Sequence, residues 1–215
     1  MPPDFYIRIR SNHYINLLVI LTRLLIGFAF IPSGLTKLLN ERFTQIPTSN
    51  PIGLYFEAMY QTGIYWQVIG LIQLGSALLL MTQRYATLGS VIYFTVLSNI
   101  WLVTISLQFT GTWIITSLMM LGTILLLCWD LEKLYPIFIG DNKTYQIENR
   151  QYPTASGNWI KAGWIIFLIN LTAAFITRFF TQYFLQIWGC ALLISTAYVI
   201  IRSIKELLEI RRSKP

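Results

Sequence analysis

Six long apolar segments alternate with short polar stretches along the chain. Each holds 18 or more residues with few charges, and they cover residues 15–38, 64–81, 85–107, 112–129, 159–178 and 182–203. A helix of about 20 apolar residues spans a hydrocarbon core roughly 30 Å thick. Strands of a membrane β-barrel instead alternate apolar and polar residues over roughly ten positions. The pattern therefore predicts an all-α integral membrane protein with six spans.

Lysine and arginine are distributed unequally between the two sides that six spans define. An even number of spans places both termini on one side, and 12 of the 16 lysines and arginines fall on that side. Only Lys37, Arg42 and Arg178 fall on the other side, and Arg23 lies within a span. Cytoplasmic loops are enriched in basic residues, so we predict that both termini are cytoplasmic. The net charge of +7 then reflects topology and anionic lipid, and the scattered basic residues argue against nucleic-acid binding.

The polar stretches divide the chain into two membrane parts. We predict a four-helix core at residues 1–135 and a C-terminal two-helix hairpin at 159–203. A polar cytoplasmic linker at 136–158 joins them, and a basic, solvated tail at 204–215 follows the hairpin. A composition of 55% hydrophobic and 12% charged residues agrees with this division, because soluble domains have about 25% charged residues.

The connection between the first two spans, residues 38–63, is long and rich in aromatic residues. Its second half is too short and too amphipathic for a span, which indicates a re-entrant or an interfacial segment. Asn50 followed by Pro51 is typical of the start of a short helix. We place this connection on the outer side of the membrane.

Arg23 is the one charge well inside an apolar span. An arginine near the centre of a spanning helix costs at least about 2.5 kcal/mol unless a partner, water or a headgroup compensates it. Asp130 ends the fourth span at a similar depth, so we predict a buried Arg23–Asp130 pair.

A second group of polar residues lies toward the outer ends of the spans. Ligand pockets combine apolar walls with a few convergent polar groups, and buried polar groups need hydrogen bonds. We expect a Lys37–Glu57 ion pair here, in a pocket suited to an amphipathic ring such as a quinone headgroup. An ordinary aromatic interface with polar residues that only join helices remains the alternative. The candidate ligand-binding residues are Lys37, Tyr55, Glu57, Tyr60, Gln67, Gln73, Asn99 and Trp101.

Cysteine and histidine offer no sign of a bound metal. The chain has two cysteines, Cys128 and Cys190, far apart in sequence, and a single histidine, His13. We therefore predict no metal site and no intrinsic cofactor, and we interpret both cysteines as packing residues.

Several motifs resemble the DoxX family of small bacterial membrane proteins over residues 15–135. The likeness rests on RLLIGFAFIPSGLTKL in the first span, GLIQ in the second, RYATLG before the third and NI within it, and LLLCWDLEKL at the end of the fourth. The resemblance implies a four-helix core in a bacterial cytoplasmic membrane, work beside oxidoreductases, and a distant likeness to the membrane subunit of thiosulfate:quinone oxidoreductase.

Three functions remain open at this point. The first is a quinone-interacting subunit beside a membrane or soluble oxidoreductase, the second a structural or assembly protein, and the third a small-solute or lipid carrier. A subunit is favoured over an autonomous enzyme because no sequence feature supplies a redox cofactor. The ranking of the redox role rests on the family resemblance alone.

Overall fold

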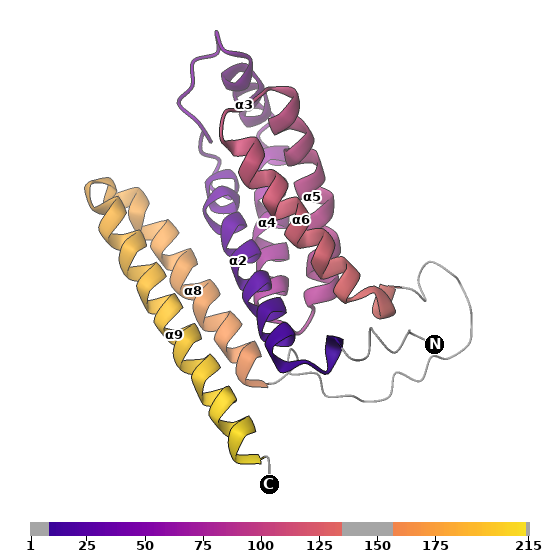
Figure 1. Ribbon diagram of the computed structural model, residues 1–215. Coiled ribbons are helices and arrows are strands. Elements are labelled where there is room, and N and C mark those ends of the chain that lie inside the picture. The colour runs from indigo at the N-terminus through magenta and orange to yellow at the C-terminus, as the bar shows by residue number, and fades with distance from the viewer. Residues whose placement is uncertain (1–8, 135–156, 214–215) are drawn as a thin grey trace.

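The computed structural model describes residues 9–134 and 157–213, and these residues form helices and no strands (Figure 1). Six of the helices are long and apolar enough to cross a membrane, which indicates a multi-pass membrane protein. They are α2 (His13–Leu38), α4 (Ile64–Met81), α5 (Ala86–Ser106), α6 (Thr112–Trp129), α8 (Gly157–Phe179) and α9 (Phe184–Ser213). The all-α class and the six spanning helices are thus confirmed.

Helix α2 lies at the centre of the molecule and contacts α4, α6 and α8. Its tightest contact is with α4, where Gly34 and Gly70 face each other. A Cβ atom added to Gly70 would lie 2.6 Å from the carbonyl oxygen of Gly34 and 2.9 Å from Cβ of Lys37. Small residues at such a crossing let two helix backbones approach closely in a membrane.

The hairpin of α8 and α9 lies on the α2 side of the bundle, away from α5 and α6 (Figure 1). Helix α8 contacts α2 and α4, whereas α9 mainly contacts α8. Helix α2 begins and α9 ends at the same end of the bundle, which we call the terminal end. The opposite end carries α3 (Pro51–Gln61), and we call it the α3 end.

The ends of the elements agree closely with the apolar segments. Helices α4 and α6 have the predicted limits, and a 3-10 turn (Thr181–Tyr183) joins α8 to α9. The expected cap of α3 is also present, since the Asn50 side chain accepts a hydrogen bond of 2.9 Å from the Ile52 backbone N–H.

Two expectations about polar segments fare differently. The linker expected at 136–158 lies almost entirely outside the described residues. The tail was expected to continue the sixth span as a solvated helix, and it is helical as part of α9 to Ser213. There Glu206 accepts a hydrogen bond of 2.5 Å from the Trp159 indole and lies 3.9 Å from His13 Nδ1. This part of the tail therefore packs against the starts of α8 and α2.

Candidate functional site

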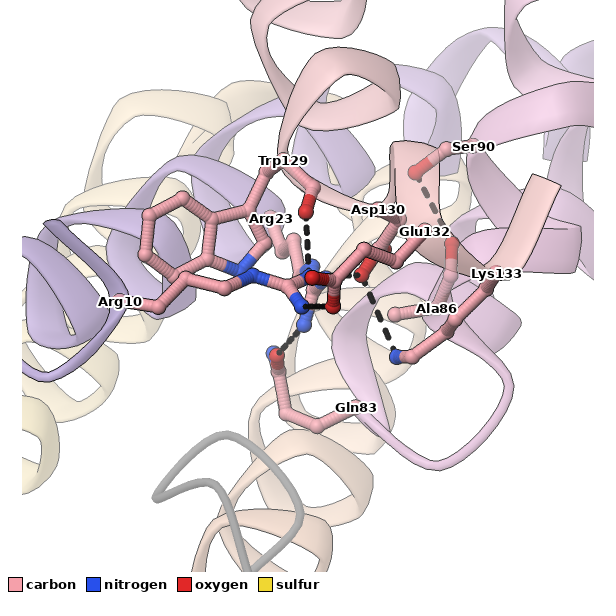
Figure 2. Close-up of polar contacts among 9 residues, drawn as sticks. All are labelled: Arg10, Arg23, Gln83, Ala86, Ser90, Trp129, Asp130, Glu132 and Lys133. Carbon is pink, nitrogen blue, oxygen red and sulfur yellow. Dashed lines mark hydrogen bonds and ion pairs between the residues drawn. The ribbon is translucent and has the colours of Figure 1, made fainter. Parts of the chain in front are cut away.

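Arg23 and Asp130 meet at the terminal end of the core, as their depth in the spans predicts (Figure 2). Arg23 Nη2 donates to Asp130 Oδ2 at 2.7 Å, and the two side chains are only 2% and 1% exposed. Asp130 also receives Lys133 Nζ at 3.2 Å and lies 3.8 Å from Arg10 Nη2. A buried carboxylate thus faces three cations, which compensates the cost of removing it from water.

Two further residues complete this cluster, and the sequence did not single out either. Gln83, in the turn between α4 and α5, accepts a hydrogen bond of 3.3 Å from Arg23 Nη1 and has a left-handed φ of 61°. Arg10 folds back over α6, where its guanidinium lies against the Trp129 ring and contacts Glu132 (Figure 2). Basic residues before a first span usually flank the membrane, so the pattern gave no signal for this contact.

Lys37 forms the centre of a second polar site, between α2 and α4. Its side chain is only 6% exposed, and its ammonium donates to the Ser33 carbonyl at 3.2 Å. The ammonium also lies over the rings of Phe43 and Trp66, 4.4 and 5.0 Å from their centroids. Among the described residues no carboxylate lies within ion-pair distance of it. Lys37 is therefore a buried cation stabilised by one carbonyl and two aromatic rings.

Gln73 adds an unused donor next to Lys37. Its side chain is fully buried, and its Oε1 accepts a long hydrogen bond of 3.5 Å from the Ser33 hydroxyl. The amide nitrogen Nε2 has no hydrogen-bond partner among the described residues. Lys37 and Gln73 both reach Ser33, so two groups with spare N–H donors lie on the same side of α2. Ser33 was not predicted, because a serine inside an apolar helix usually bonds its own backbone.

The expected Lys37–Glu57 ion pair is absent. Glu57 instead forms a two-point contact with Arg42, whose Nε and Nη2 donate to its two oxygens at 2.8 and 3.0 Å. Arg42 lies in the loop that joins α2 to α3, and Arg42 also lies over the Tyr60 ring. A planar guanidinium matches the two oxygens of a carboxylate better than an ammonium does, and the path of the loop places Arg42 beside Glu57.

The other candidate ligand-binding residues do not converge either. Gln67 donates to the Leu38 carbonyl at 3.4 Å, and Trp101 donates to Ser117 on α6 at 2.9 Å. Tyr55 packs against Phe56 on α3, and Asn99 is exposed on the outer face of α5. The prediction of a single pocket beneath the outer connection is therefore wrong, although Lys37 and Gln73 both contact Ser33.

A pocket of about 500 Å³ lies elsewhere, between the core and the hairpin. Helix α2 contributes Phe28, Pro32 and Thr36, and α9 contributes Trp188 and Leu192. Its polar rim contains Glu41, Arg42 and Arg178, and Arg178 Nε donates to a Glu41 oxygen at 3.0 Å. None of the eight candidate residues lines this pocket. Phe43 lines it, however, and the same ring lies beneath the Lys37 ammonium.

The Arg42–Glu57 contact predicts an acid-sensitive attachment of α3. The hydrogen bonds from Arg42 hold the pKa of Glu57 below its usual value of 4.5. A lowered folded-state pKa stabilises the native contact above pH 4.5, and this stabilisation is lost as the pH falls through the lowered pKa. In a Cys128→Ser, Cys190→Ser background, a fluorophore attached through Ala58→Cys should report loosening of α3 in this acid range. Glu57→Gln should remove that transition, whereas an unchanged transition would assign it to another carboxylate.

Comparison of the chain with protein-family models, with curated proteins and with solved structures finds no match. Within residues 9–134 and 157–213, no group of three or more histidine, cysteine, aspartate or glutamate side chains is arranged to hold a metal ion.

Proposed function

We propose that the protein is a DoxX-like membrane subunit that binds the ring headgroup of a quinone at Lys37 and Gln73, beside an oxidoreductase. The observation that supports this proposal is the buried Lys37 ammonium, which has no carboxylate partner among the described residues. An ionisable group inside a membrane span is costly and is typical of a functional site. A structural role alone would favour a neutral residue or a matched ion pair, such as the pair at Arg23.

The donors available at this site suit a carbonyl oxygen. The ammonium has three N–H donors and uses one for Ser33, and the Gln73 amide nitrogen uses none. Both groups donate, so their common ligand is an acceptor such as a quinone carbonyl. Phe43 and Trp66 supply the apolar surface that a flat ring needs. Displacement of Phe43 would connect this site with the pocket between α2 and α9.

The redox association and the location in a bacterial cytoplasmic membrane rest on the DoxX-like motifs at residues 15–135. These motifs include Arg23 and Lys37, which occupy the two polar sites. With both termini on the cytoplasmic side, as the distribution of basic residues predicts, Lys37 lies toward the outer leaflet. The partner oxidoreductase would then receive electrons from, or deliver them to, a quinone pool in the same membrane.

Purification in a mild detergent, followed by extraction and mass spectrometry, tests the proposal. A quinone that co-purifies near one molecule per chain would support it. A stable protein partner without a quinone would favour the assembly role, and another bound lipid or solute would favour a carrier.

Lys37→Met should weaken quinone binding about 10- to 100-fold, because a hydrogen bond from a charged donor contributes about 1.5–3 kcal/mol. Gln73→Leu should weaken it less, since the amide is neutral. Quenching of tryptophan fluorescence by added decyl-tailed quinone measures the dissociation constant. Lys161→Met removes an exposed lysine of α8 and serves as the control. Equal affinity of Lys37→Met and Lys161→Met would leave Lys37 a packing residue.

A further inference from the structure

Asn99 is an amide that faces outward from the middle of a spanning helix. It lies on α5 seven residues before Ser106, which is about 10 Å along the axis at 1.5 Å per residue. Its side chain is exposed and makes no hydrogen bond within the described residues. Its polar neighbours behave differently, because Thr95 and Ser98 donate to the carbonyls of Val91 and Phe94 at 3.0 and 2.7 Å. Asn99 is therefore a polar side chain of this face that forms no hydrogen bond with its own helix.

The face around Asn99 is shaped for another helix. The exposed residues Leu88, Val91, Thr95, Asn99 and Leu102 succeed one another at spacings of three or four residues. Such spacings place side chains along one stripe of a helix, as in paired helices. Helix α5 contacts α4 and α6, and the hairpin lies on the other side of the bundle (Figure 1). Nothing in the described chain covers this stripe.

We propose that this stripe is the contact between two copies of the chain, with Asn99 of one copy hydrogen-bonded to Asn99 of the other. Hydrocarbon offers no hydrogen bonds, so an amide at this depth gains most from a polar partner. A carboxamide has both a donor and an acceptor, and it is therefore complementary to itself. Two copies in the same membrane share one orientation, and a two-fold axis along the membrane normal places each residue of the stripe opposite its equivalent.

Cysteine cross-linking in native membranes tests the position of the contact. In a Cys128→Ser, Cys190→Ser background, Leu102→Cys should form a disulfide-linked dimer on mild oxidation. Leu193→Cys is the control, because Leu193 is an exposed leucine of α9, a helix that lies on the other side of the bundle. Dimers through position 193 and not 102 would overturn the proposal, as would cross-links from position 102 only to other proteins.

Substitution of Asn99 tests the chemistry of the contact. Asn99→Leu should weaken dimerisation in liposomes about tenfold, in the range measured for polar contacts between membrane helices, whereas Asn99→Gln should retain it. Counting of photobleaching steps at several protein-to-lipid ratios gives the dimer fraction. Unchanged dimerisation of Asn99→Leu, or single copies at every ratio in the unsubstituted chain, would overturn the proposal. The cross-linking result uses the native Asn99 and therefore stands even if Asn99→Leu folds poorly.

Discussion

Asp130→Leu should lower the free energy of unfolding by about 3–5 kcal/mol, the cost of leaving a buried charge without its partner. Asp130 is 1% exposed and, within residues 9–134 and 157–213, is the only carboxylate that lies against Arg23. After the substitution, Arg23 keeps Gln83 at 3.3 Å, which is a neutral acceptor. The guanidinium also has a buried Nε without a partner among the described residues. Thermal unfolding followed by tryptophan fluorescence in detergent measures the loss.

Arg23→Leu provides an asymmetric comparison. Asp130 would keep Lys133 at 3.2 Å and Arg10 at 3.8 Å, so its charge would still be compensated. We therefore expect a smaller loss than for Asp130→Leu, and a double Arg23→Leu, Asp130→Leu variant should recover part of the stability. Equal losses of stability for the two single variants would show that Lys133 and Arg10 do not compensate Asp130. No loss for either variant would show that the Arg23–Asp130 contact does not stabilise the fold.

The Arg23–Asp130 pair could be predicted from the sequence because a charge buried in hydrocarbon can be compensated in only a few ways. An arginine in a span must meet a polar group at its own depth, and only a few such groups exist in this chain. The helix limits followed in the same way, because each spanning segment must satisfy its backbone hydrogen bonds internally. The depth of a polar residue in the membrane and the length of each spanning helix can thus be predicted from the positions of the apolar residues.

The positions of the polar residues toward the α3 end were harder to predict, because the depth of a residue in its span does not show which way its side chain faces. Apolar and small polar residues occur on every side of helix α5, so its sequence does not indicate which face turns inward, and Asn99 faces outward. The loop between α2 and α3 decides which cation meets Glu57, and its path follows no periodic pattern. Lys37 lies one turn beyond Gly34, where α2 packs against α4, and the sequence did not predict this position.

Gly163→Ala should destabilise the attachment of the hairpin by about 3 kcal/mol. Gly163 lies in α8 directly against the end of α4, and a Cβ atom there would overlap the Met81 carbonyl oxygen and lie 2.8 Å from the Thr82 Cα. These are backbone atoms, which cannot turn aside as a side chain can, so α8 must shift away from the core. The shift would also disturb the neighbouring contact of Trp159 with Glu206.

Gly189→Ala is the matched control for this prediction. Gly189 lies in α9 of the same hairpin, and an added Cβ would meet nothing within 4 Å. Alanine is favoured over glycine in a helix by about 1 kcal/mol, so this variant should unfold at the same temperature as the unsubstituted chain or higher. Tryptophan fluorescence during heating compares the two variants in one detergent. A Gly163→Ala protein as stable as Gly189→Ala would mean that α8 does not pack on the end of α4 as closely as the backbone contact at Met81 requires.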